Sequence, residues 1–151
     1  MNEFRLIQNS VLPPNKIFEI SVDIKNFHHI LPNNFKSLKI IKNDKSEKIV
    51  IEKIKFLGFS TIVKTKHVII PPSLHYVFIL SGPLKGSFFI ESYKKSEIGT
   101  AIIIDVYLKF FGFMNGFSFL NNYIIKRMSS VMGEFIKAAE IKVHSENFNN
   151  V

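Results

Sequence analysis

The sequence predicts a single α+β domain, in which a curved antiparallel sheet of seven strands faces one long C-terminal helix. Its 151 residues, which include no cysteine, are enough to bury one core without disulfides. Residues 35–108 form a series of segments rich in Ile, Val, Phe, Tyr and Thr, separated by short turns. Residues 117–143 change to helical spacing. Together these patterns indicate one sheet covered by one helix.

The N-terminal part predicts a strand followed by two short helices. Glu3–Gln8 has strand character and ends at the two prolines of Leu12–Asn15. Pro14 is well placed to open a helix, because its fixed φ suits the first helical turn. Asp23 and Asn26 can cap a second short helix, which the turn residues 31–34 end.

The middle of the chain predicts six further strands. Their expected ranges are Phe35–Lys42, Lys48–Phe56, Phe59–Ile70, Leu74–Ser81, Ser87–Tyr93 and Thr100–Leu108. The connections are a few residues long and rich in Gly, Pro, Asn and Ser, which favours antiparallel neighbours.

The C-terminal segment predicts one amphipathic helix over Phe117–Val143. Its apolar positions recur every three or four residues, at Phe117, Leu120, Ile124, Met128, Val131, Phe135 and Ala138. The polar tail His144–Val151 is expected to be frayed.

Composition narrows the function classes. The net charge is +8, but only Arg5 and Arg127 are arginines and the lysines are dispersed, which argues against nucleic-acid binding. A basic surface favours anionic small ligands or transient contact with a membrane. The N-terminus has no signal-peptide pattern, and no apolar run reaches the roughly 18 residues of a membrane span, so a cytoplasmic location is expected.

A seven-stranded sheet facing one helix has more concave apolar surface than the helix can cover, so a ligand cavity is expected between them. Strand alternation and helical spacing assign residues to its wall, although an ordinary core is the alternative for each aliphatic side chain. The predicted ligand-binding residues are Val63, Thr65, His67, His75, Val77, Ile79, Phe88, Ile90, Ile104, Val106, Leu120, Ile124, Met128 and Val131.

His67 and His75 form the most informative polar pair. A hairpin centred on Pro71 places them opposite one another on the inward face. They are candidates for anchoring a ligand carboxylate or hydroxyl; the alternative is a half-exposed cross-strand pair that satisfies itself. Two histidines without a third ligand do not complete a zinc site. No nucleophile elbow or phosphate loop is present, so neither catalytic residues nor a cofactor are predicted.

Several short motifs resemble the START-related helix-grip superfamily, which includes birch-pollen-allergen-like proteins, polyketide cyclases and coenzyme Q-binding proteins. The residues that carry this resemblance are Phe56, Gly58, Phe59, Thr65, Pro72, Gly82-Pro83, Phe88, Ile90, Glu91, Gly99-Thr100, Arg127-Met128 and Phe135. The Lys- and Ile-rich, cysteine-free character is also similar to a small family of fatty-acid carriers from thermoacidophilic archaea. The resemblance implies a helix-grip domain spanning residues 1–151.

The sequence therefore favours a non-enzymatic carrier of a fatty acid or a similar anionic lipid. The alternatives are a polyketide cyclase-like enzyme, and a quinone or isoprenoid chaperone that docks on membranes through exposed aromatics such as Phe110, Phe111 and Phe113. The sequence leaves the oligomeric state open.

Overall fold

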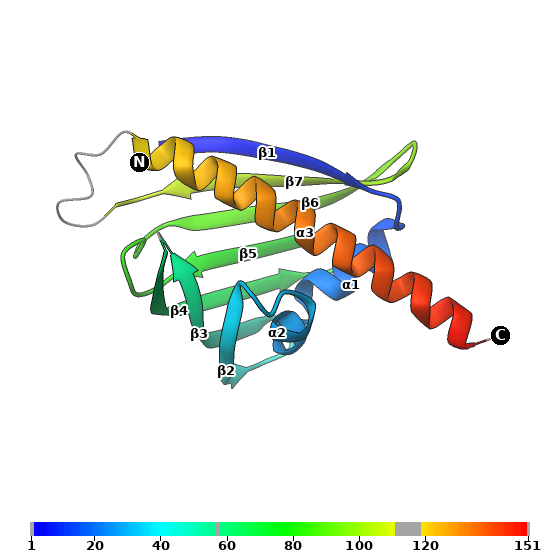
Figure 1. Ribbon diagram of the computed structural model, residues 1–151, viewed down its shortest axis with the longest axis horizontal. Helices are drawn as coiled ribbons and strands as arrows, with labels where there is room; N and C mark the ends of the chain where they lie inside the picture. Colours follow the sequence, from blue (N-terminus) through cyan, green and yellow to red (C-terminus); the bar gives the residue numbers. More distant parts are fainter. Residues whose placement is uncertain (1, 57, 111–118, 151) are drawn as a thin grey trace.

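The computed structural model describes residues 2–56, 58–110 and 119–150. They form one antiparallel sheet crossed by a long helix, with two short helices at one end (Figure 1). The strands are β1 (Asn2–Ser10), β2 (Phe35–Asn43), β3 (Glu47–Phe56), β4 (Phe59–Ile70), β5 (Leu74–Ile79), β6 (Phe88–Ser96) and β7 (Gly99–Leu108). The helices are α1 (Pro14–Val22), α2 (Phe27–Ile30), which follows a 3-10 turn at Ile24–Asn26, and α3 (Phe119–Asn149). The predicted fold class is confirmed.

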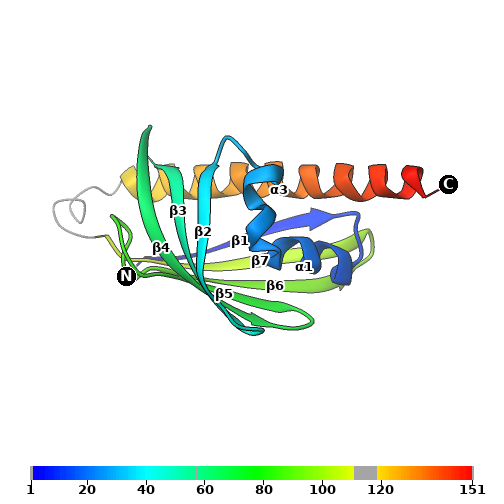
Figure 2. The same cartoon turned by 90° about the horizontal axis from the view of Figure 1, so that it is seen from below.

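The sheet order is β1-β7-β6-β5-β4-β3-β2, so β1 and β2 are the edge strands. Every pairing is antiparallel. The sheet is strongly curved, and β2, β3 and β4 rise toward α3 while β5, β6 and β7 lie beneath it (Figure 2). This curvature separates part of the sheet from the helix.

Strand β7 shows how the sequence positions the core. Alternate side chains are buried along its whole length, at Thr100, Ile102, Ile104, Val106 and Leu108. They face α3, whose buried side chains are Leu120, Ile124, Met132, Ile136 and Ala139. The inward positions predicted for Ile104 and Val106 are therefore confirmed.

Helix α3 is longer than predicted. It continues to Asn149, and its last turns extend past the sheet (Figures 1 and 2). The predicted fraying of residues 144–151 is wrong as far as Asn149, because a polar composition ends burial without ending a helix. The rings of His144 and Phe148, four residues apart, pack edge to face with centroids 4.8 Å apart. The predicted helix start at Phe117 lies outside the described residues. Among the described residues, no helix is long and apolar enough to cross a membrane.

Candidate ligand-binding site

A cavity of about 330 Å³ lies between the inner face of the sheet and α3. This volume is within the range of small-molecule sites. Most of its wall is apolar, and α3 contributes Tyr123, Ile124, Arg127, Met128, Val131, Met132, Phe135 and Ile136. The short helices close one side, where Phe27 packs against Phe135 with ring centroids 5.8 Å apart.

Most of the predicted site residues lie in the wall of this cavity. They are Val63, Thr65, His67, His75, Val77, Ile79, Ile104, Ile124, Met128 and Val131. Val106 and Leu120 are also buried, 0% and 3% exposed, but they pack in the core and do not line the cavity. The alternation on β4, β5 and β7 and the spacing on α3 therefore locate the cavity wall.

The predicted face of β6 is wrong. Phe89, Glu91 and Tyr93 line the cavity, and Phe88 and Ile90 lie on the outer face of the sheet. There the ring of Phe88 stacks on Tyr107, with centroids 4.4 Å apart. The run Phe88-Phe89-Ile90 is apolar on both faces, so alternation gives no cue, and the packing of Phe89 opposite Val106 decides the orientation.

The β4–β5 pairing also differs from the prediction. His67 lies opposite Val77 and His75 opposite Ile69, because the hairpin is centred on Pro72. A shift of two residues keeps the same side chains inward, so both histidines still face the cavity. They are 3% and 1% exposed, so the half exposure in the alternative interpretation is wrong. The pairing that it describes is present, because His67 Nδ1 and His75 Nε2 lie within hydrogen-bonding distance.

A continuous row of polar side chains crosses the apolar wall, and we call it the polar track: Glu52, Thr65, His67, His75, Glu91 and Tyr93. Thr65 Oγ1 lies 3.0 Å from both Glu52 Oε1 and His67 Nε2. His67 Nδ1 lies 2.9 Å from His75 Nε2. His75 Nδ1 lies 2.8 Å from Glu91 Oε2, to which the Tyr93 hydroxyl also donates at 2.9 Å. Four neighbouring strands, β3 to β6, contribute these residues.

Burial and neighbouring charges set the ionisation of the polar track. Burial lowers the pKa of His67, and the hydrogen bond to Glu52 opposes only part of this shift. Burial also opposes ionisation of Glu91, but the charge and hydrogen bond of His75 outweigh it and lower the pKa of that carboxyl. Burial and the nearby Glu91 raise the pKa of Tyr93 well above its ordinary value. At neutral pH, His67 is neutral, Glu91 is ionised and Tyr93 keeps its proton.

The two carboxylates of the polar track were missed by the sequence interpretation. Glu52 is followed by Lys53 and Lys55 in IEKIK, a context typical of a solvated strand, but it is only 5% exposed. Its neighbours at two-residue spacing, Val50 and Ile54, are the signal that places it inward. Glu91 lies on the strand whose face was predicted wrongly.

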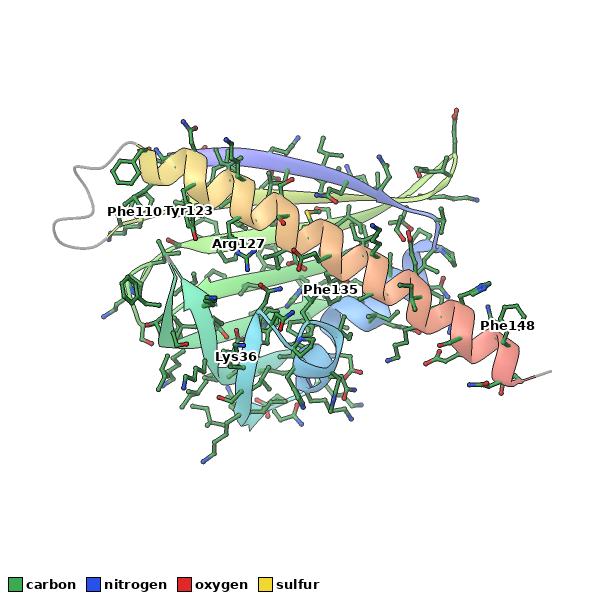
Figure 3. All side chains as sticks on the ribbon, viewed as in Figure 1. Lys36, Phe110, Tyr123, Arg127, Phe135 and Phe148 are labelled. Carbon is green, nitrogen blue, oxygen red and sulfur yellow. The ribbon has the colours of Figure 1, made fainter. Side chains whose placement is uncertain are left out.

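A cationic mouth, formed by Lys55 and Arg127, adjoins the cavity. These two residues and Tyr123 line both the cavity and a second hollow, which Gly58 completes. Tyr123 and Arg127 follow one another along α3 (Figure 3). Arg127 donates to Asn34 Oδ1, which connects α3 to the segment between α2 and β2.

The prediction that Phe110 is an exposed aromatic able to contact a membrane is wrong. Phe110 is 6% exposed and belongs to the core, so it does not present its ring at the surface. Phe111 and Phe113 lie outside the described residues.

Comparison with solved structures establishes the class of this domain. TTHA0849 from Thermus thermophilus superposes with a TM-score of 0.77 at 14% identity, covering 96% of this chain and 99% of that one. Ara h 8.0201 gives 0.73 at 19% identity, covering 95% and 98%. The Zhui aromatase/cyclase from Streptomyces sp. R1128 gives 0.77 at 11% identity, covering 94% and 95%.

The chain therefore has the helix-grip fold, which the resemblance of its sequence implied. No protein-family model matches the sequence, and no curated relative does either. At these identities the likeness concerns the fold, so the function has to be argued from the cavity.

Proposed function

We propose that this protein binds and carries an elongated, mainly apolar small molecule in the cavity between the sheet and α3, preferably a fatty acid or a similar anionic lipid. The observation that carries this proposal is the cavity wall, to which both layers of the fold contribute apolar side chains. Burying each methylene of an acyl chain contributes roughly 0.8 kcal/mol. An apolar wall therefore binds such a chain without detailed polar recognition.

The mouth supports an anionic head group. Lys55 and Arg127 are the lysine and arginine that line the cavity among the described residues. A carboxylate placed beside them keeps contact with water, so it gains charge-assisted hydrogen bonds at little desolvation cost. The histidines serve this purpose less well, because each of their ring nitrogens already has a protein partner and two carboxylates flank the pair.

Met128→Trp tests the occupancy of the cavity. The added volume is expected to abolish binding of a fluorescent acyl probe, because Met128 lines the cavity directly. Since the indole enters existing space, the loss of stability should be smaller than the roughly 1–3 kcal/mol that overpacking of a dense core costs. Lys137→Trp, at an exposed position of the same helix, is the matched control and should bind normally. Unchanged probe binding by a folded Met128→Trp protein would contradict the proposal.

A cyclase-like enzyme is the second candidate, and the polar track is the observation that favours it. Glu52, His67, His75, Glu91 and Tyr93 bring groups capable of acid–base chemistry to the wall of a cavity. The two candidates differ in the fate of the ligand. Native mass spectrometry after mild purification distinguishes them, because a carrier retains an unaltered acyl chain and an enzyme releases a changed product.

A further inference from the structure

We propose that the polar track selects ligands that carry a hydroxyl group along their apolar body, and that the hydroxyl donates its proton to Glu52 or Glu91. This inference rests on the proposed function and specifies the class of ligand. It follows from counting the protons available to the polar track and the acceptors that remain once they are used.

The count begins at Glu91. Its Oε2 accepts from the Tyr93 hydroxyl and from His75 Nδ1, so His75 carries a proton on Nδ1. At the other end, Thr65 has one hydroxyl proton but lies 3.0 Å from two groups, Glu52 Oε1 and His67 Nε2. In one arrangement of protons, Thr65 donates to Glu52 Oε1 and accepts from His67 Nε2.

The remaining contact lies between the two rings. With protons on His67 Nε2 and His75 Nδ1, the contact from His67 Nδ1 to His75 Nε2 needs one more proton. The five contacts of the polar track therefore need five protons, of which the two hydroxyls and two neutral imidazoles supply four. One further proton is shared along the polar track, whose two carboxylates then leave it a net charge of about −1. Moving one proton from His67 through Thr65 to Glu52 leaves the number of protons and the net charge of the polar track unchanged. Every donor proton of the polar track is used within it.

What remains is acceptor capacity. Glu52 Oε2 and Glu91 Oε1 accept no hydrogen bond from the residues that the structure describes. Both oxygens keep some accessible surface, and both residues line the cavity. These two oxygens are therefore available to a ligand.

The free acceptors of the polar track determine which ligand group can bind there. A ligand carbonyl or carboxylate only accepts hydrogen bonds, so the polar track has nothing to offer it and the negative charge repels an anion. A hydroxyl supplies the missing donor, and hydrogen bonds to a charged acceptor are the stronger kind. A plain methylene at the same place leaves a carboxylate oxygen desolvated, which opposes binding.

The position of the hydroxyl follows from the mouth. Glu52 and Lys55 lie on β3 three residues apart, which corresponds to about 10 Å along the strand. A carboxylate at Lys55 therefore places the middle of an acyl chain, and not its carboxyl end, beside the polar track. Mid-chain hydroxy fatty acids match both features.

The test compares stearic acid with 10- and 12-hydroxystearic acid as competitors of one fluorescent acyl probe. In a uniformly apolar cavity the hydroxyl weakens binding, because it loses its hydrogen bonds to water. The polar track reverses this order, and at least one hydroxy acid is expected to bind about tenfold tighter than stearic acid. Stearic acid binding tighter than both hydroxy acids overturns this proposal and leaves the carrier function intact; failure of all three to bind overturns the carrier function itself.

Glu52→Gln and Glu91→Gln connect the preference to the polar track. Each puts a neutral amide nitrogen, which donates, in place of the free carboxylate oxygen, so the folded variant is expected to lose most of the preference for the hydroxy acid. Stearic acid, which the desolvated carboxylate disfavours, should bind the variant no more weakly than the unaltered protein. Glu97→Gln, in the exposed turn between β6 and β7, is the control and should keep the preference. A preference that survives in both folded variants overturns the proposal. If neither variant folds, the comparison on the unaltered protein still decides it.

Discussion

His67 shows how the fold imposes a chemical state on a single residue. Its side chain is 4% exposed, and its partners come from strands on both sides of β4. Burial lowers the pKa of the ring, and the adjacent His75 adds to this shift. In the unfolded chain the ring regains its ordinary pKa of 6.5. Folding and protonation of His67 therefore oppose one another.

The stability of the protein should consequently fall in mildly acidic solution. Below pH 6.5 the unfolded chain takes up a proton at residue 67 that the folded protein does not bind, so acidification favours unfolding. The expected loss is up to about 1.4 kcal/mol of unfolding free energy per pH unit. Urea denaturation at pH 6.5, 6.0 and 5.5 measures it. Glu91, whose pKa is lowered, adds a loss in the same direction only below pH 4.5, outside this window.

His67→Gln provides the comparison for this measurement. Glutamine keeps hydrogen-bonding capacity but does not titrate, so the folded variant should lose less stability than the unaltered protein between pH 6.5 and 5.5. Parallel losses in the two proteins would show that protonation of other groups causes the effect.

Among the structural elements, the turn between β6 and β7 packs against the segment that leads from β1 to α1. Gly99 has φ of +146°, and a Cβ atom added there would lie 2.4 Å from Ser10 O. The Thr100 hydroxyl donates to Leu12 O at 2.7 Å. The Gly-Thr pair thus holds β7 close to the end of β1 and the start of α1, and only glycine permits that approach.

Gly99→Ala should therefore destabilise the protein strongly, by roughly 3 kcal/mol or more, because a clash with backbone adds to the strained φ. Gly58→Ala is the matched control. Gly58 also has a positive φ, +81°, but an added Cβ meets nothing within 4 Å, so only the conformational cost of about 1 kcal/mol applies. Thermal unfolding of the two variants measures the difference, and equal losses would show that the close approach at residue 99 is unimportant.

The elements also show what the sequence could predict. Helix starts, turns and strand types follow from local chemistry such as Pro14, Gly99 and the β-branched runs, and these predictions agree with the structure within a few residues. The orientation of β6 could not be predicted, because Phe88, Phe89 and Ile90 suit either face. The inward position of Glu91 depends on that orientation, and the partners that satisfy Glu91 and Glu52 lie on neighbouring strands, which no local pattern contains.

Across the whole molecule, charge is arranged around the cavity in two regions of opposite sign. The cationic mouth lies at one point of the rim, and the polar track carries negative charge on the inner wall. The net charge of the chain, +8, adds a long-range attraction for anions that salt screens. If the ligand is an anionic lipid, as proposed, this arrangement should draw its head group to the mouth and keep the head group from entering first.

Arg127→Gln tests this arrangement. Removing a partly exposed cation is expected to weaken stearic acid binding about two- to fivefold at low salt and less at high salt, because exposed ion pairs contribute little and are screened. Methyl stearate, which lacks the charge, should bind the variant and the unaltered protein alike. Lys126→Gln, the exposed neighbour on α3, is the control for net charge and should have a smaller effect. Equal affinities for the acid and the ester at pH 5.5 and pH 7.5 would contradict an anionic head group at the mouth.

The two edge strands of the sheet, β1 and β2, differ in how their outer edges are protected. Along β1, side chains tie the edge to α3: Gln8 donates to Ser129 O at 2.7 Å, and Ser10 donates to Glu140 at 2.8 Å. The pairing of β2 with β3 is instead interrupted twice, and Lys36, Lys39 and Lys42 are exposed along β2. An irregular, lysine-bearing edge is a poor template for a strand of another molecule. The open edge of this sheet is therefore expected to resist pairing with a second copy of the chain, the step by which β-rich proteins grow into fibrils.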